Sequence, residues 1–162
     1  MLEKRPAITR LIIIMYKIKL RLSFFIITVA VFASCKNYYI PKDSFIKQFH
    51  GMDSTRLRNV KVRGPYGSVY NYAANSINTI RCVDKKGNSA ELSNSPSIET
   101  RITLNNKKRV IFYFDRVIMQ DSIVYGIQSR FLTNIRKAIP VKDITKIEVQ
   151  DGHKNFVYIE VE

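Results

Sequence analysis

The chain has 162 residues, 46% of them hydrophobic and 11% aromatic, a composition that suits one globular domain and excludes a disordered chain. Its charge is one-sided, with 27 Lys and Arg residues against 13 Asp and Glu. Six of those cations and one acid precede residue 34, which leaves 21 cations against 12 acids, a net charge of +9, for the rest of the chain. A cytosolic protein this basic would be expected to bind nucleic acid, whereas an exported one would meet anionic lipid or cell-envelope polymers.

The chain begins with a segment typical of a secretory signal. An apolar run covers residues 22–34, follows three cations within residues 17–21, and closes on small residues. A membrane-spanning helix needs about 20 apolar residues, and those cations interrupt the longer apolar stretch before them. The pattern therefore predicts an N-terminal signal helix within a signal peptide over residues 1–34. Met15 is an alternative start, because a compact signal follows it.

The four residues Phe32-Ala33-Ser34-Cys35 close the apolar run. They resemble the lipobox of bacterial lipoproteins of the Gram-negative envelope, although Phe32 stands where Leu is usual. The resemblance implies cleavage before Cys35 and covalent lipid on that residue, with no other cofactor. Lys36 stands where inner-membrane retention signals place Asp, so the same resemblance implies an outer-membrane anchor that faces the periplasm. An ordinary cleaved signal followed by a chance cysteine is the alternative.

Two short segments follow the cysteine. Residues 35–42 are predicted to be a lipid-anchored tether, and six or so extended residues reach only about 20 Å. Asp43 to Gly51 is predicted to be a short helix, since Asp43 can cap it, apolar residues share one face, and Gly51 suits its exit. Residues 43–162 are expected to form a single β-rich domain.

From residue 58 onward, apolar and polar residues alternate with period two, as they do in half-buried strands. The alternating runs and the turn sequences between them recur at short intervals: runs at 60–63, 98–104, 145–150 and 157–161, and turns at 64–67, 84–88, 105–108 and 151–155. The predicted fold class is therefore mainly β, a small antiparallel sandwich or barrel preceded by one short helix, after the N-terminal signal helix.

The last third of the chain has the most distinct order of elements. Residues 109–120 are predicted to be a long strand with a bend or bulge at residues 115–116, followed by a strand over 123–130. A short strand then precedes a single helical turn at 142–144 and a further strand. This order, over residues 109–150, is similar to that of SH3-like small barrels.

Patterns that indicate catalysis or metal binding are few. Ser44-Phe-Ile-Lys47 spells S-x-x-K and resembles the nucleophile motif of penicillin-binding proteins, but the companion S-D-N and K-T-G motifs are absent, so a chance helix composition is the favoured interpretation. The two histidines, His50 and His153, lack the further ligands that a zinc site needs, so no metal site is predicted. Cys82 is predicted to be a buried strand thiol.

Cations recur in two groups that could bind an anion. The candidate residues are Arg56, Lys61, Arg63, Lys107, Lys108 and Arg109. One interpretation is an anion-binding face, and the other is a rim of solvated charges. The partners expected are membrane lipid through the anchor and an anionic envelope polymer or protein, with no nucleic acid. No pattern indicates an oligomeric state.

These observations favour a membrane-anchored envelope lipoprotein with a non-enzymatic binding or structural role. An alternative is a small envelope hydrolase that acts on a cell-wall or lipid substrate, with catalytic residues that no motif identifies. A remote alternative is a basic nucleic-acid-binding β-barrel, which requires that the leader is not a signal.

Overall fold

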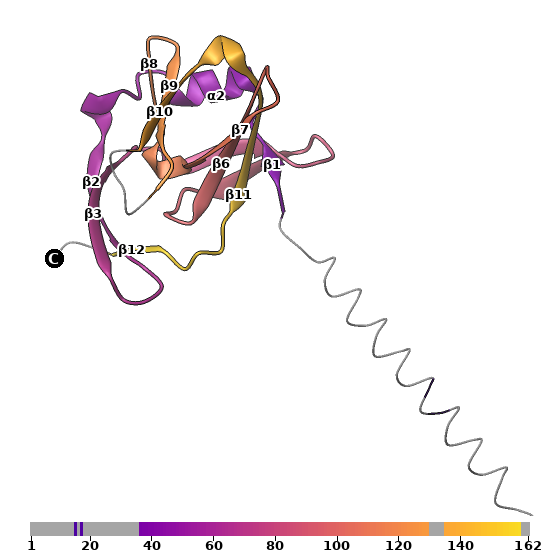
Figure 1. Ribbon diagram of the computed structural model, residues 1–162, viewed down its shortest axis with the longest axis vertical. Coiled ribbons are helices and arrows are strands. Elements are labelled where there is room, and N and C mark those ends of the chain that lie inside the picture. The colour runs from indigo at the N-terminus through magenta and orange to yellow at the C-terminus, as the bar shows by residue number, and fades with distance from the viewer. Residues whose placement is uncertain (1–14, 16, 18–35, 130–134, 160–162) are drawn as a thin grey trace, which may run out of the picture. The chain divides into compact units, whose positions relative to one another are not determined.

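The computed structural model describes residues 15, 17, 36–129 and 135–159 (Figure 1). The chain divides into two units between Cys35 and Lys36, and the second unit is the folded domain. The predicted signal peptide, apart from Met15 and Lys17, lies outside the described residues, and so do Phe32, Ala33, Ser34 and Cys35.

The domain is built from short strands joined by tight turns. In chain order, with η for a 3-10 helix, its described elements are β1 (Tyr38–Tyr39), α2 (Lys42–Phe49), η1 (Ser54–Arg56), β2 (Arg58–Arg63), β3 (Val69–Ala74), β4 (Thr79–Val83), β5 (Ser89–Ser93), β6 (Ile98–Leu104), β7 (Arg109–Tyr113), η2 (Phe114–Arg116), β8 (Ile118–Gln120), β9 (Ile123–Ile127), β10 (Arg136–Pro140), η3 (Val141–Asp143), β11 (Ile144–Asp151) and β12 (Val157–Ile159). The strand pairs among them are antiparallel. The prediction of a mainly β, antiparallel domain with one short helix is confirmed.

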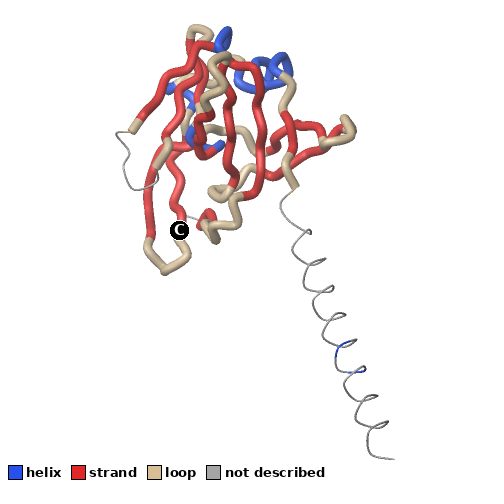
Figure 2. Tube along the Cα trace, turned by 45° about the vertical axis from the view of Figure 1, so that its right-hand side comes forward, coloured by secondary structure: helices blue, strands red, loops and turns tan. Residues whose placement is uncertain are grey.

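The strands form three sheets, shown in red in Figure 2. The largest has the order β5-β4-β1-β11-β6-β7, the second has the order β10-β9-β8, and the third has the order β12-β2-β3. In the largest sheet β1 lies between β4 and β11, so the start of the domain pairs with strands from its middle and its end. This non-local pairing holds the first residues of the domain in place.

The described part of the segment predicted to be a tether, residues 36–42, contributes to the sheet and the core. Tyr38 and Tyr39 form β1, where Tyr38 is paired with Val149, and the side chain of Ile40 is buried. Aromatic and β-branched residues fit the half-buried surface of a sheet. Pairing with β11 therefore begins at Tyr38, within the segment predicted to link the anchor to the domain.

The short helix forms where it was predicted, with different capping. α2 begins at Lys42, and its N-cap position is Pro41, which makes no side-chain capping bond. Asp43 is therefore not the cap; it lies in the first turn, where its negative charge faces the positive end of the helix dipole. Gly51 follows the helix with a φ of +70°, a backbone conformation that glycine adopts at low cost.

Most of the other local predictions are confirmed. The alternating runs become β2, β6, β11 and β12. The bend expected at residues 115–116 is η2, which separates β7 from β8, and the helical turn expected at 142–144 is η3, one residue earlier. Residues 123–127 of the predicted 123–130 strand form β9.

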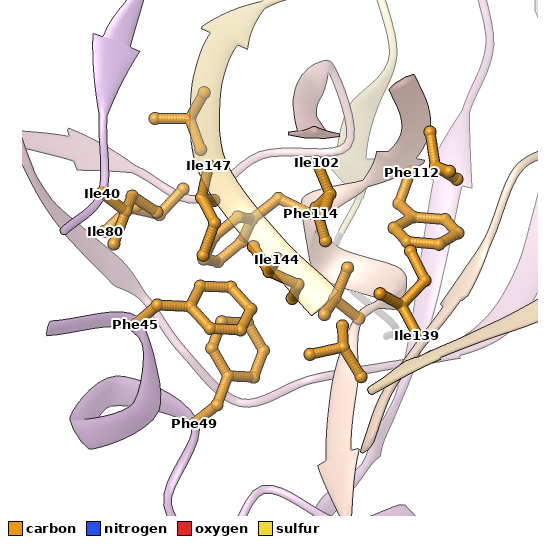
Figure 3. Packing of buried hydrophobic residues seen from close by; sticks show 14 of the residues in the cluster. Ile40, Phe45, Phe49, Ile80, Ile102, Phe112, Phe114, Ile139, Ile144 and Ile147 are labelled. Atoms are coloured by element: carbon orange, nitrogen blue, oxygen red, sulfur yellow. The ribbon is translucent and has the colours of Figure 1, made fainter. Parts of the chain in front are cut away.

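The core lies between α2, the largest sheet and the β10-β9-β8 sheet, which contributes Val124 and Ile139 (Figure 3). Phe45 and Phe49, one turn apart on α2, stack with their ring centroids 4.4 Å apart, and Phe49 reaches the ring of Phe114 at 5.4 Å. Buried isoleucines from neighbouring strands surround these rings, among them Ile80, Ile102, Ile144 and Ile147. Truncation of a buried phenylalanine to alanine typically costs about 3–5 kcal/mol, so the two rings of α2 fasten the helix to the sheet.

One end of the domain, here called the proximal end, contains Lys36, the loop 151–156 and the β2–β3 turn at 64–68. Because β1 runs antiparallel to β11, the residues before Tyr38 continue toward the 151–156 loop. The ring of Phe156 in that loop lies 6.4 Å from the ring of Tyr70, which follows the β2–β3 turn. In Figure 1 the loop 151–156, drawn in yellow, runs between the start of β1 on the right of the domain and the β2–β3 turn at its lower left.

The opposite end, called the distal end, consists of the β6–β7 turn at 105–108, η3 and the β8–β9 turn at 121–122. The N–H of Asn105 donates to the carbonyl of Asp143 at 2.9 Å, and the N–H of Val141 donates to the carbonyl of Ser122 at 2.9 Å. Backbone hydrogen bonds therefore hold these three turns together.

Candidate functional sites

The six cations predicted as one candidate anion-binding set are divided between separate parts of the domain. Lys61 and Arg63 lie on β2 and Arg56 lies in η1, whereas Lys107, Lys108 and Arg109 occupy the β6–β7 turn and the first position of β7. β2 and β7 belong to different sheets. Arg63 lies next to the β2–β3 turn, at the proximal end. Lys107, Lys108 and Arg109 lie in or next to the β6–β7 turn, at the distal end.

Exposed apolar side chains gather at the proximal end. Tyr66 is 96% exposed, Val69 is 49% exposed and Val157 is 44% exposed. Val157, Arg63 and Val69 are paired in register across β12, β2 and β3, so they form one row on the outer face of that sheet. Val62, the neighbour of Arg63, faces inward and is fully buried. This face combines apolar and cationic side chains, and it is called the proximal face below.

The turn that carries Tyr66 is held by its own backbone. The N–H of Gly67 donates to the carbonyl of Gly64 at 3.0 Å, and the N–H of Gly64 donates to the carbonyl of Ser68 at 2.8 Å. Gly67 has a φ of +80°, and the ring of Pro65 fixes φ at the residue before Tyr66. Tyr66 was not predicted as a site residue, although its place in a Gly-Pro-x-Gly turn is a signal of exposure.

A buried carboxylate joins the third sheet to the rest of the domain. Asp115 of η2 is fully buried and accepts hydrogen bonds from the hydroxyl of Tyr72 at 2.5 Å and from the hydroxyl of Tyr158 at 3.1 Å. The guanidinium of Arg116 lies 4.4 Å from the centre of the Tyr72 ring. A buried carboxylate requires such partners. The cluster is therefore a structural joint beneath the proximal face.

A second buried acid lies under the 151–156 loop. Glu99 of β6 forms an ion pair with Lys154 and accepts a hydrogen bond from the amide of Gln150 at 3.2 Å. Burial acts to lower the pKa of Lys154, but its bond to Glu99 and the charges of Tyr113 and Glu99 together raise that pKa above its usual value. Lys154 is therefore cationic at neutral pH, and it neutralises the buried acid.

A groove of about 710 Å³ opens beside α2. Its lining comes from α2, β4, β5 and the segment before β4 and includes Ser44, Lys47, Gln48, Asn78, Thr79, Arg81 and Glu91. The side-chain amide of Gln48 accepts from the N–H of Arg81 at 2.8 Å and donates to its carbonyl at 2.9 Å. β1 pairs with β4 only at Val83. Beside Arg81 of β4, the Gln48 amide therefore takes the place of a neighbouring strand.

The S-x-x-K residues both line this groove without forming a catalytic pair. The hydroxyl of Ser44 accepts a hydrogen bond from the amide of Gln48 at 3.1 Å. Among the described residues, no hydrogen bond joins Ser44 to Lys47. The arrangement is that of neighbours on a helix surface.

The remaining candidate residues have ordinary environments. Cys82 is buried, as predicted, and burial together with the charge of Glu91 raises the pKa of its thiol. His50 and His153 are exposed, and Nδ1 of His153 lies 3.6 Å from the carboxylate of Asp151. Within the described part of the chain, no group of three His, Cys, Asp or Glu side chains is placed to hold a metal ion.

Comparisons with known proteins add no relative. No protein family, no curated protein and no solved structure matches the chain. The resemblances to lipoproteins and to SH3-like barrels therefore depend on the residues that indicated them. Among the described residues, no helix has the length and apolar character needed to cross a membrane.

Proposed function

We propose that this chain is a lipoprotein of the cell envelope, anchored through lipid on Cys35, whose β-domain has a non-enzymatic binding role. The observation that carries the proposal is the position of the domain boundary, since the folded unit begins at Lys36, directly after the cysteine. Cleavage before Cys35 would leave the acylated residue next to the domain and would keep β1 intact. Two or more acyl chains, at about 0.8 kcal/mol per buried methylene, would hold such a domain stably at a bilayer.

Palmitate labelling tests the anchor. We expect label in the wild type and in Cys82→Ser, and none in Cys35→Ala, because Cys35 and Cys82 are the two cysteines of the chain. The labelled protein should fractionate with the envelope, and with the outer membrane if Lys36 directs sorting as the lipobox resemblance implies. Label that persists in Cys35→Ala contradicts the proposal.

The distal end is the part of the domain that this anchor would leave available to a partner. Four exposed cations lie there, Lys107, Lys108, Arg109 and Lys142. Positive charge of this kind attracts an anionic envelope polymer or an acidic protein surface. We expect the double variant Lys107→Gln/Lys108→Gln to sediment less with isolated cell wall than the wild type does. Equal sedimentation would argue against a binding role for this end.

A second candidate function is a small envelope hydrolase. The observation that favours it is the placement of Ser44 and Lys47 together on the groove beside α2. If Ser44 were a nucleophile, a fluorophosphonate probe would label the wild type and leave Ser44→Ala unlabelled. The binding proposal predicts no label in either protein.

A further inference from the structure

We propose that the proximal face lies on an anionic phospholipid surface, with Tyr66 at the level of the lipid headgroups. The orientation of the domain in this proposal rests on the lipid anchor proposed above. The contact itself is made by side chains of the folded domain, so it can be tested with and without the anchor.

The first argument is the place where the domain begins. Tyr38 is paired with Val149, so the chain before it runs toward the 151–156 loop, and Lys36 lies at the proximal end. One residue spans at most about 3.6 Å. Lipid on Cys35 would therefore hold this end of the domain close to the bilayer and leave no tether long enough to turn the domain over.

The second argument is the apolar part of the proximal face. Tyr66 is almost fully exposed on a turn whose backbone bonds and glycine conformation fix its position. Tyrosine is enriched at membrane interfaces, because its ring has an apolar body and a polar tip. Val69 and Val157 extend the apolar surface behind it along the outer face of the sheet.

The third argument is the charge of the same surface. Arg63 lies between Val157 and Val69 in the cross-strand row, and Lys36 marks the start of the domain at the same end. Two acids lie at this end: Glu99 is paired with Lys154, and the exposed carboxylate of Asp151 lies 3.6 Å from Nδ1 of His153. Cations interleaved with apolar side chains are the pattern by which proteins bind anionic membrane interfaces.

Sedimentation of the unanchored domain, residues 36–162, with lipid vesicles tests the contact. This segment contains the described strand pairs and the hydrophobic core cluster, so it has what it needs to fold without residues 1–35. We expect binding to vesicles that contain phosphatidylglycerol, weaker binding to pure phosphatidylcholine, and loss of binding as salt is raised.

Single substitutions locate the contact. We expect Arg63→Gln to weaken binding to phosphatidylglycerol vesicles roughly fivefold, the effect of one cation at an anionic surface. We expect Tyr66→Ser to weaken it roughly tenfold, because an interfacial aromatic group is lost. Lys137→Gln is the matched control, since it removes one exposed cation from β10, outside the proximal face, and it should bind as the wild type does. Equal losses in Arg63→Gln and Lys137→Gln would overturn the proposal in favour of unspecific charge attraction.

A tryptophan probe tests the same contact in the mature lipidated protein. The chain contains no Trp, so Tyr66→Trp and Lys108→Trp each provide a single fluorophore. Binding to phosphatidylglycerol vesicles should shift the emission of the tryptophan at position 66 to the blue, and brominated lipid in those vesicles should quench it. Neither change should occur for the tryptophan at position 108. Equal responses, or a response at position 108 alone, would contradict the proposal.

The two proposals can fail separately. If Cys35→Ala retains palmitate, the anchor is wrong, but binding of the 36–162 segment to vesicles still tests the proximal face. If the anchor is correct and neither Tyr66→Ser nor Arg63→Gln changes vesicle binding, the proximal face does not contact lipid.

Discussion

The two ends of the domain are both basic, yet they are built differently. At the proximal end, exposed apolar side chains flank Arg63 on both sides, and the structure beneath them contains two buried acids, Asp115 and Glu99. At the distal end, the exposed cations Lys107 and Lys108 lie on turns that backbone hydrogen bonds connect. Net charge alone therefore does not distinguish the two ends, whereas the apolar surface and the buried acids do.

This difference makes the proximal end the part of the domain that is more sensitive to substitution of ionisable groups. A buried acid that loses its partner pays a desolvation cost, whereas an exposed cation on a turn remains solvated. Comparisons of matched substitutions at the two ends should therefore show unequal changes in the free energy of unfolding.

The largest difference is expected at Asp115. Asp115→Ala removes the acceptor for the hydroxyls of Tyr72 and Tyr158, and it should lower the free energy of unfolding by about 3 kcal/mol, measured by urea denaturation. Asp115→Asn keeps an acceptor oxygen and should cost less.

Asp121 in the β8–β9 turn is the matched acid of the distal end. It is exposed and has a φ of +51°, a conformation that asparagine tolerates. Asp121→Asn should change the free energy of unfolding by less than about 0.5 kcal/mol. If Asp121→Asn lowered the free energy of unfolding as much as Asp115→Asn does, the structural role assigned to the Asp115 hydrogen bonds would be wrong.

A smaller difference is expected for the lysines. Lys154→Met leaves Glu99 without its cation and should lower the free energy of unfolding by about 1 kcal/mol, because the lysine side chain is 43% exposed and solvent screens the pair. Lys142→Met, at the distal end, should have almost no effect.

The effect of Lys154 should depend on pH in one direction. Its pKa in the folded domain is raised above the unfolded value of about 10.4. The stabilisation is therefore fully present below the unfolded pKa and is lost as the pH rises through the folded pKa. The difference between the wild type and Lys154→Met should stay constant through neutral pH and shrink at strongly alkaline pH. If the difference instead disappeared in mildly acidic solution, the titration of a group other than Lys154 would be responsible for it.

The local features of the fold could be predicted from the sequence, because they depend on neighbouring residues. Period-two alternation identified the strands at 60–63 and 98–104, and Asp-Gly and Asn-rich segments identified turns. β1 was missed because it has two residues, and its strand character comes from pairing with Val149, more than a hundred positions away. Alternation cannot be recognised in so short a segment.

The candidate sites show the same limit. The cations were recognised, but their division between the two ends follows from which sheet each strand joins. Asp115 was predicted only as part of a bend, since its partners Tyr72 and Tyr158 lie 43 positions before and after it. Tyr66 could have been recognised as exposed from its turn, but Val69 and Val157 become its neighbours only through the pairing of β2 with β3 and β12.

The smallest expected difference concerns the turns themselves. Gly67 at the proximal end and Lys107 at the distal end both have a left-handed backbone, with φ of +80° and +63°. A Cβ at Gly67 would meet no atom within 4 Å, so Gly67→Ala adds backbone strain alone and should cost about 1 kcal/mol. Lys107→Gly relieves the same strain but adds freedom to the unfolded chain, so its net effect should be within about 0.5 kcal/mol. Thermal unfolding of both variants measures the contrast. A larger cost for Lys107→Gly would show that the lysine side chain, and not only the backbone hydrogen bonds, stabilises the distal end.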